Sequence, residues 1–574
     1  MDYMQVYESW LEDQYFDEAT KKELLDIAGD EKEIEDRFYR ELEFGTGGLR
    51  GLIGAGTNRM NIYTVRKATQ GLANYIIKAG GQEKGAAIAY DSRRMSKEFA
   101  KEAALCLNSN GIKTYIFESL RPTPELSFAV RELKCIAGIV ITASHNPAEY
   151  NGYKVYWEDG AQITPPHDKN ILAEVAAVTS YDQVSTIEEE EAVKLGLYNV
   201  IGEEIDARYM EELKKQSIHP EIIRKMAEDI KIVYTPLHGT GNLPVRRVLK
   251  ELGFKQVYVV EEQEKPDGKF PTVSYPNPED PKAFALALKL AEEVDADIVL
   301  ATDPDADRLG VYAKDSKTGE YVSFTGNMSG MLIAEYILRE KKKNGTLPEN
   351  AALVKTIVTT NMADVLCRDY GVRLTEVLTG FKFIGEQIKL FEENDSYSYI
   401  FGLEESYGCL AGTYARDKDA CVAVMMLCEA AAAYKEEGKT LWDGMLELYE
   451  KYGYFREDLE TITLKGISGA EQIKEIMEKL RSAPPADIGG TRVKEVRDYQ
   501  SSVVKNLETG EEKTLILPKS NVLYFEMEDD CWCCARPSGT EPKIKFYIGV
   551  KADSLDSADE LLKKVKEDLT GRAR

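Results

Sequence analysis

The sequence predicts an α/β protein of several domains, and three observations support this prediction. The chain has 574 residues, too long for one hydrophobic core at about 150 residues per domain. Short apolar strands alternate with segments of helical length, which is typical of βαβ units and a mainly parallel sheet. The alternation restarts near residues 230 and 352 and changes character near residue 456. We therefore expect three consecutive α/β domains with mixed, mainly parallel sheets, followed by a C-terminal α+β domain. The expected domains are residues 1–205, 206–323, 324–455 and 456–574.

The first domain begins with amphipathic segments and continues with strands and helices in alternation. Apolar residues at helical spacing predict two helices within residues 1–43, with no chemistry in them. After a glycine-rich stretch, the expected order is the strand AAIAYD, a helix at 97–109, the strand KTYIF, a helix at 124–133 and the strand GIVI. Ligands bind at strand ends in such proteins, because the chain leaves the core there.

The second and third domains repeat the alternation. Helices separate the strands IKIVYTP, QVYVV and ADIVLAT in the second domain, and ALVKTIVTT, LTEVLTG and YSYIFGLEES in the third. The fourth domain mixes strands and helices and carries a long alternating segment at 521–547. This pattern favours an α+β domain.

Composition and charge exclude several classes of function. Lys and Arg number 73 against 99 Asp and Glu, a net charge of −26 that repels nucleic acid and anionic membranes. No apolar run is long enough to cross a bilayer, and the acidic, aromatic N-terminus is unlike a secretory signal. Nine Cys, mostly in apolar segments, fit a reducing compartment. We expect a cytoplasmic protein. A small anionic substrate could still be held, but only in a locally basic cleft.

The segment Cys531–Cys534 is the one cysteine-rich motif. A zinc site there would need a second Cys/His pair at suitable spacing, and the sequence has none. A half-buried strand is the favoured interpretation.

A polar hook, Thr142-Ala143-Ser144-His145-Asn146-Pro147, follows the apolar strand of the first domain. The hydroxyl of Ser144 is either a turn cap or a nucleophile. Taken alone, the cap is favoured, because Ser and Asn commonly bond nearby backbone in turns. The motif is not a G-x-S-x-G elbow, since Thr142 and Asn146 occupy the glycine positions. Other motifs must decide between the two interpretations.

Three carboxylates follow the last strand of the second domain in Asp303-Pro304-Asp305-Ala306-Asp307-Arg308. Oxygen ligands at this spacing can converge on one hard divalent cation, Mg²⁺ or Ca²⁺. An EF-hand is excluded, because Arg308 replaces its glycine, Lys314 replaces its final Glu, and a strand precedes the loop. A solvated acidic turn is the weaker alternative, since three like charges so close repel one another without a cation.

Two further segments offer weaker signals. In Phe44–Gly51 four glycines let backbone amides approach a ligand, and Arg50 adds a guanidinium suited to phosphate. A flexible turn explains that segment about as well. In the third domain, TGFK and GLEESYG follow strands, and adjacent carboxylates accept hydrogen bonds from sugar hydroxyls. A surface Glu pair is the common alternative.

The fourth domain carries the motif RPSGTEPK. Arg536, Ser538 and Thr540, with backbone amides freed by Gly539, form an anion nest. A bare β-turn would explain the Pro and Gly but not an Arg beside two hydroxyls. Phosphate binding is therefore favoured.

Together these motifs resemble one family. TASHNP followed by YNGYK, then DPDADR, GLEESYG and RPSGTEPK, occur in the order seen in the α-D-phosphohexomutase superfamily. FGTGGLRG, YTPLHGTG and TGFK make the chain similar to its phosphoglucomutase branch, close to the bacterial enzymes and to related phosphopentomutases. The resemblance spans about residues 40 to 550 and implies four domains around a central cleft.

The resemblance also implies roles for individual residues. Ser144 would be carried as phosphoserine and would bind Mg²⁺ with Asp303, Asp305 and Asp307. His145 would support the phosphoryl site, while Lys154 and either His238 or Arg308 would assist proton movement. The implied substrate-binding residues are Arg50, Lys382, Glu404, Ser406, Arg536, Ser538, Gly539 and Thr540. In one departure, some relatives have His where this chain has Gly408, so an acid/base role for that His cannot be carried over.

The implied activity is a reversible phosphoryl transfer between glucose 1-phosphate and glucose 6-phosphate, through glucose 1,6-bisphosphate. Phosphopentomutase, phosphomannomutase and sugar-bisphosphate synthase activities are alternatives within the family. A non-catalytic sugar-phosphate-binding protein is the alternative from another class. We expect an isomerase that acts on small sugar phosphates and exists as a monomer or weak dimer.

Overall fold

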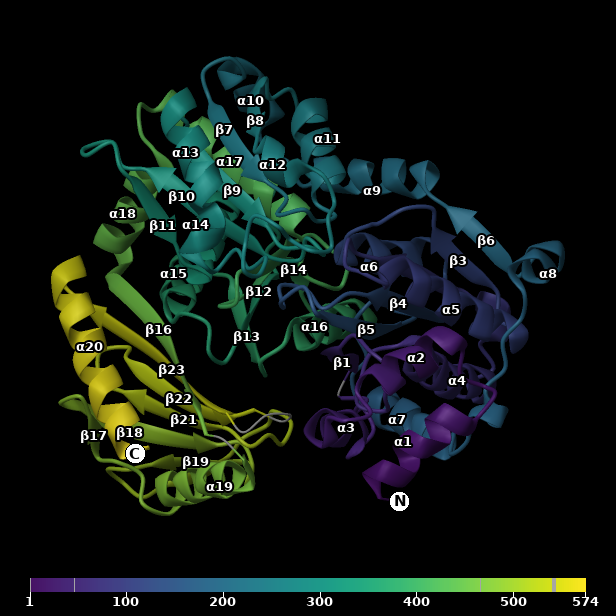
Figure 1. Ribbon diagram of the computed structural model, residues 1–574. Helices are drawn as coiled ribbons and strands as arrows, with labels where there is room; N and C mark the ends of the chain where they lie inside the picture. Colours follow the sequence, from purple (N-terminus) through teal and green to yellow (C-terminus); the bar gives the residue numbers. More distant parts are fainter. Residues whose placement is uncertain (1, 46, 465, 539–542, 574) are drawn as a thin grey trace.

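The computed structural model describes residues 2–45, 47–464, 466–538 and 543–573. It contains four sheets that follow one another along the chain (Figure 1). Parallel and antiparallel strands are mixed in the first three sheets, and the fourth is antiparallel. This confirms the predicted fold class of three α/β domains and a C-terminal α+β domain. The division at residues 205, 323 and 455 remains a proposal.

The first sheet has the order β1 (Gly48–Leu52), β5 (Tyr150–Trp157), β4 (Ala137–Ile141), β2 (Ala86–Tyr90), β3 (Thr114–Phe117) and β6 (Tyr198–Ile201). Its helices are α4 (Ile62–Lys78), α5 (Ser96–Ser109), α6 (Thr123–Glu132), α7 (His167–Ala177) and α8 (Glu189–Lys194). Strands β4 and β2 are parallel and buried along their whole length, which explains their unbroken apolar sequence. The hook with Ser144 follows the end of β4.

Three helices precede this sheet, where the sequence predicts two: α1 (Tyr3–Glu12), α2 (Glu18–Asp26) and α3 (Glu31–Phe38). The prediction was wrong because two aspartates start new helices. Asp17 caps α2 by accepting from the Thr20 amide, and Asp30 caps α3 by accepting from the Glu33 amide. The helices enclose an aromatic cluster that includes Trp10.

The second sheet has the order β11 (Tyr321–Phe324), β10 (Leu309–Lys314), β9 (Ile298–Thr302), β7 (Lys231–Thr235) and β8 (Gln256–Val259). Its helices are α9 (Glu203–Lys215), α10 (Pro220–Met226), α11 (Asn242–Leu252), α12 (Glu261–Glu264) and α13 (Ala285–Val294). The third sheet has the order β13 (Arg373–Val377), β12 (Ala351–Thr356), β14 (Ser398–Glu404) and β15 (Gly408–Ala411). Its helices are α14 (Gly326–Lys343), α15 (Met362–Tyr370), α16 (Phe381–Glu393), α17 (Ala420–Glu436) and α18 (Leu441–Tyr452).

Helix α17 joins the second and third domains. It is buried from Ala420 to Tyr434 and packs against α10, α11 and α14. One hydrophobic cluster runs through the first three domains, so they share a continuous core. Among the described residues, no helix is both long and apolar enough to cross a membrane.

The fourth sheet has the order β16 (Tyr454–Thr463), β23 (Lys543–Ala552), β22 (Trp532–Pro537), β21 (Leu523–Met527), β18 (Thr491–Asp498), β19 (Val503–Asn506) and β20 (Glu512–Thr514), with β17 (Asp487–Ile488) paired to β18. Helices α19 (Gly466–Ser482) and α20 (Leu555–Arg572) pack against it. Cys533 and Cys534 lie on β22, which confirms the predicted strand. The strand is buried on both faces here rather than half-buried, because Cys533 and Cys534 pack in two different hydrophobic clusters. This domain has its own core and follows α18 through β16 (Figure 1).

Candidate active site

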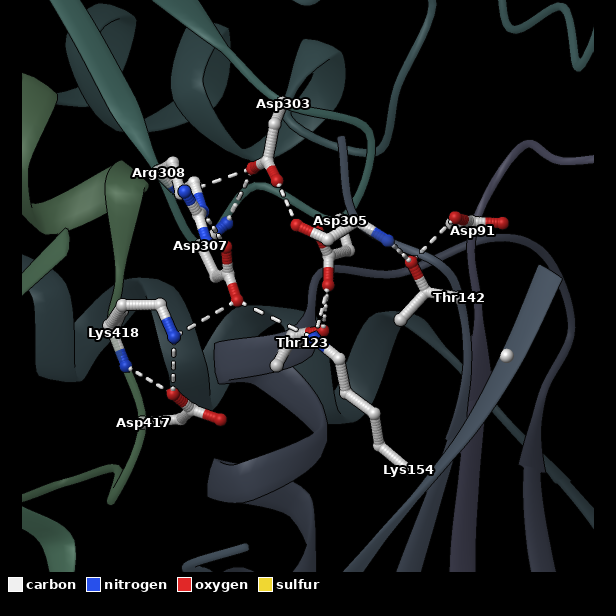
Figure 2. Close-up of polar contacts among 12 residues, drawn as sticks. Asp91, Thr123, Thr142, Lys154, Asp303, Asp305, Asp307, Arg308, Asp417 and Lys418 are labelled. Atoms are coloured by element: carbon white, nitrogen blue, oxygen red, sulfur yellow. Dashed lines mark hydrogen bonds and ion pairs between the residues drawn. The ribbon is translucent and has the colours of Figure 1, made fainter. Parts of the chain in front are cut away.

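Ser144 lies just beyond β4 in a buried, tightly held loop. Its φ of 51° is in the left-handed region, which non-glycine residues adopt infrequently. Its amide donates to Thr142 Oγ1 at 2.8 Å. Thr142 Oγ1 donates to Asp91 Oδ2 at 2.7 Å (Figure 2). The Ser144 hydroxyl donates to Asp303 Oδ2 at 2.6 Å. The fold therefore brings the hook of the first domain onto the carboxylate loop of the second.

The three carboxylates after β9 converge as the sequence predicts. Asp303, Asp305 and Asp307 are buried, and one oxygen of each lies within 4.8 Å of the others. Asp305 Oδ1 and Asp307 Oδ1 are buried and accept no hydrogen bond among the described residues. Burial, together with the neighbouring Asp305 and Asp307, raises the pKa of Asp303 well above its usual value. A buried all-oxygen set in which two carboxylate oxygens lack hydrogen-bond partners fits a hard divalent cation.

Backbone bonds from two other domains hold this loop. The Thr123 amide, at the start of α6, donates to the Asp305 carbonyl at 2.9 Å, and the Ala420 amide, at the start of α17, donates to the Ala306 carbonyl at 3.1 Å. The Leu309 amide donates to the Tyr407 carbonyl at 2.9 Å. The loop is thus fixed by the packing of three domains.

Lys154, on β5, points to the same carboxylates. Its Nζ lies 2.8 Å from Asp305 Oδ2 and 3.5 Å from Asp307 Oδ2 (Figure 2). Burial acts to lower the pKa of Lys154, but the charges of Asp305 and Asp307 outweigh it and raise the pKa. Lys154 is therefore an ammonium, able to give a proton and to neutralise charge.

Three cationic or titratable side chains flank Ser144. His145 Nδ1 lies 3.3 Å from Ser144 Oγ, and burial, Arg308 and Arg50 lower the pKa of His145 well below its usual value. Arg50, on β1, donates to Asn146 Oδ1 at 3.3 Å. Arg308 forms an ion pair with Glu279 and lies 3.9 Å from Asp307. His145 is thus neutral, and the two guanidiniums supply positive charge suited to phosphate.

Sequence reasoning missed Lys418, which the structure places in the centre of the site. Its Nζ lies 3.2 Å from Asp307 Oδ2 and 3.3 Å from Asp417 Oδ1 (Figure 2). It also lies 3.7 Å from Glu404 Oε1. Burial acts to lower the pKa of Lys418, but these carboxylates outweigh it and raise that pKa well above its usual value. A Cβ at Gly408 would lie 2.0 Å from Lys418 Cδ. The side chain of Lys418 therefore fills the space that a residue larger than glycine at 408 would occupy.

The loop after β14 carries the expected Glu404 and Ser406, and the Ser406 hydroxyl donates to Glu404 Oε1 at 2.8 Å. Glu405, the second residue of the predicted Glu pair, accepts from Thr356 Oγ1 at 3.0 Å. Burial and the charge of Glu404 raise the pKa of Glu405 to about 7. Lys418 links this loop to the carboxylates of the second domain.

The other expected substrate-binding residues lie on β22, after it and on α16. Arg536, on β22, lies 3.5 Å from the Tyr547 hydroxyl, and the Ser538 amide donates to the Lys543 carbonyl. Lys382 lies in the first turn of α16. Gly539 and Thr540 are outside the described residues.

His238 is occupied within the second domain. Its Nδ1 lies 3.0 Å from the Lys265 carbonyl oxygen, and its Nε2 lies 2.9 Å from Thr272 Oγ1. Both ring nitrogens therefore have partners in the loop after α12. This arrangement favours Arg308 over His238 as the residue that assists Lys154.

Family models match three consecutive parts of the chain. These are the phosphoglucomutase/phosphomannomutase alpha/beta/alpha domain I at residues 41–182, domain II at 207–318 and domain III at 325–452. A phosphoglucomutase of Staphylococcus saprophyticus is 35% identical over 95% of this chain and 97% of the relative. A phosphoglucomutase of Staphylococcus aureus (strain USA300) is 38% identical over 92% of this chain and 93% of the relative.

Solved structures show the same fold. The pp63/parafusin phosphoglucomutase of Paramecium, in an open form, matches with a TM-score of 0.67 at 18% identity, covering 93% of this chain and 95% of that one. A phosphoglucomutase/phosphomannomutase family protein from Burkholderia thailandensis matches with a TM-score of 0.63 at 19% identity, covering 91% of this chain and 96% of that one. The chain therefore belongs to the phosphoglucomutase/phosphomannomutase family, and it is an isomerase of the phosphohexomutase class.

Proposed function

We propose that this enzyme interconverts glucose 1-phosphate and glucose 6-phosphate through a phosphoserine at Ser144, with glucose 1,6-bisphosphate as the intermediate. The observation that carries the proposal is the 2.6 Å contact between the Ser144 hydroxyl and Asp303 of a three-carboxylate loop. Phosphoryl transfer depends on positioning and on neutralising charge, and this arrangement supplies both.

We assign Mg²⁺ to the carboxylate cluster as the cofactor. Asp303, Asp305 and Asp307, with an oxygen at Ser144, would hold the ion. The unpartnered buried oxygens of Asp305 and Asp307 support this assignment. When bound, Mg²⁺ neutralises the charge that an anionic substrate meets at a phosphorylated serine. Positive charge also comes from Arg50, Arg308, Lys154 and Lys418.

The chain's own residues account for the proton transfers. In the first half-reaction, the sugar hydroxyl attacks phosphorus and the bond from phosphorus to Ser144 Oγ breaks. The hydroxyl gives its proton to the Lys154 amine, which has released its own proton to Ser144 Oγ. Lys154 Nζ, held as an ammonium by Asp305 and Asp307, supplies the proton that Ser144 Oγ takes up. The bisphosphate then turns within the site. In the second half-reaction, Ser144 Oγ attacks the other phosphate and the bond from that phosphorus to the sugar oxygen breaks. Lys154 takes the proton from Ser144 Oγ and supplies one to the sugar oxygen.

The remaining residues are assigned to substrate binding. Glu404 and Ser406 accept and donate hydrogen bonds to the sugar hydroxyls. The distal phosphate is assigned to Arg536, Ser538, Gly539 and Thr540, with Lys382 and Arg50 along the path. We also place the enzyme in the cytoplasm, as a monomer or weak dimer that acts on small sugar phosphates and binds neither nucleic acid nor membranes.

Turnover on three sugar phosphates tests the substrate. We expect a higher kcat/KM on glucose 1-phosphate than on mannose 1-phosphate or ribose 1-phosphate, each measured with its own bisphosphate. A preference for ribose 1-phosphate would indicate a phosphopentomutase, and a preference for mannose 1-phosphate would indicate a phosphomannomutase. Accumulation of bisphosphate would indicate a synthase. A silent binding protein would bind glucose 1-phosphate but exchange no phosphoryl group at Ser144 by intact-mass analysis.

Lys418→Met should lower kcat by about 10²-fold or more, the size of effect that a positioned acid or base contributes. The change removes the ammonium that neutralises Asp307, Asp417 and Glu404. Lys418→Arg keeps the charge and should retain more activity. Gly408→Ala should also lower kcat, because its methyl group displaces Lys418 without removing it. Unchanged steady-state rates in both Lys418→Met and Gly408→Ala would contradict a role for this lysine.

A further inference from the structure

Arg93 gathers the backbone of the loop that carries Ser144. Its side chain is fully buried. Nη2 donates to the carbonyl oxygens of Ser144, at 2.5 Å, and Asn146, and Nη1 donates to those of Pro147, at 2.7 Å, and Tyr150, at 3.1 Å. One guanidinium thus donates to four carbonyls within the loop between β4 and β5. A buried carbonyl left without a donor would be costly, so this side chain determines the shape of the turn.

Asp91, at the end of β2, completes the arrangement from the other side. Its Oδ1 accepts from the Arg93 amide at 2.9 Å and from Ser96 Oγ at 2.7 Å. Its Oδ2 accepts from Thr142 Oγ1 and lies 3.3 Å from Arg93 Nε. Thr142 Oγ1 in turn accepts the Ser144 amide. Asp91 and Arg93 therefore hold the Ser144 peptide through its N–H and its C=O.

A loop of the second domain covers this pair. The guanidinium carbon of Arg93 lies 5.1 Å from the ring centroid of Phe270, which is buried. A Cβ at Gly268 would lie 2.5 Å from the Arg94 amide nitrogen, so glycine lets the two loops touch. The same domain carries Asp303, the partner of Ser144. Arg93 therefore lies between the nucleophile loop and the domain that holds the carboxylates.

The geometry assigns Asp91 and Arg93 as positioning residues, which hold Ser144 in its left-handed backbone conformation and align it with the carboxylate loop through Phe270. This inference rests on the proposed function for its effect on turnover. Both residues act through the Ser144 peptide, Arg93 on its carbonyl and Asp91 on its amide through Thr142. Misplacing a reacting group by about 1 Å can cost about 10²-fold in rate. Loss of the four hydrogen bonds from the Arg93 guanidinium should therefore slow the chemical step and leave the affinity for the sugar unchanged.

Arg93→Lys tests the inference, because it keeps the positive charge and loses the four-carbonyl fork. We expect kcat on glucose 1-phosphate to fall by about 10²-fold while KM stays within about 2-fold. Phosphorylation of Ser144 by glucose 1,6-bisphosphate, followed by intact mass, should slow by the same factor. Thr142→Val is a smaller change and should likewise lower kcat while leaving KM nearly unchanged. It replaces Arg93→Lys as the test variant if Arg93→Lys does not fold.

The matched control is Arg59→Lys. Arg59 is also buried and also bonds carbonyls and a carboxylate, but its partners are Asp36 and Asn58. It should lose comparable thermal stability and keep its kcat. An equal loss of kcat in Arg59→Lys, or an unchanged kcat in both Arg93→Lys and Thr142→Val, overturns the inference.

Hydrogen exchange separates the inference from the proposed function. In wild-type protein the amides of residues 142–150 should exchange slowly, and in Arg93→Lys they should exchange faster while those of β4 do not. Unchanged exchange in this loop overturns the positioning role, whatever the enzyme turns over. Faster exchange with no wild-type turnover of any sugar phosphate supports the positioning role and rejects the proposed function instead.

Discussion

Ser144→Ala should abolish turnover of glucose 1-phosphate, with kcat lower by about 10⁴-fold or more, as when the nucleophile of a covalent mechanism is removed. The variant lacks the only atom of that side chain that can carry a phosphoryl group. The fold should persist, because the lost hydroxyl makes one strong contact, to Asp303, and the loop is held by its backbone. Circular dichroism and thermal unfolding would check the fold, and intact mass after incubation with glucose 1,6-bisphosphate would show no added phosphate.

Ser109→Ala is the matched control for this experiment. Ser109 lies at the end of α5, where its hydroxyl donates to the Cys106 carbonyl. This variant should keep wild-type turnover and still gain one phosphoryl group. Activity retained in Ser144→Ala would mean that another residue carries the phosphate.

The sequence was sufficient for the fold class because strands buried on both faces leave continuous apolar runs. Ala86–Tyr90 and Ile298–Thr302 are buried at every position, and both were recognisable as strands. Likewise, Ser144 and Asp303 each follow such a run, so the sequence predicted both as candidate site residues at strand ends. The sequence could not show that their side chains meet at 2.6 Å. That contact depends on the packing of two domains.

Residues that act across domains were harder to recognise. Lys418 lies in the charged segment ARDKDA, which resembles a solvated turn, and its role emerges only beside Asp307 and Gly408. Arg93 bonds backbone carbonyls, and such partners leave no mark in a sequence. The missing signal for Lys418 was the glycine at 408, where some relatives have His. An absent side chain is informative only once the structure shows what fills its space.

Removal of divalent cations should likewise abolish turnover, and Mg²⁺ should restore it. Asp303, Asp305 and Asp307 crowd buried negative charge that a cation compensates, and ligand binding at 100 times its Kd stabilises a fold by about 2.7 kcal/mol. We therefore expect EDTA to lower the midpoint of thermal unfolding and added Mg²⁺ to raise it. Asp305→Asn should weaken Mg²⁺ binding, whereas Asp315→Asn, on the β10–β11 turn, should not.

The pH dependence of this binding follows from Asp303. Burial and its two neighbours raise the pKa of Asp303, so a proton competes with the metal. Metal binding needs the ionised carboxylate, and the apparent affinity for Mg²⁺ should therefore fall as the pH is lowered towards and below that pKa. Isothermal titration calorimetry at several pH values, in buffers of different ionisation enthalpy, would measure both the affinity and the protons released. Full activity in EDTA, or an affinity for Mg²⁺ that rises as the pH falls, would contradict a metal site formed by these three aspartates.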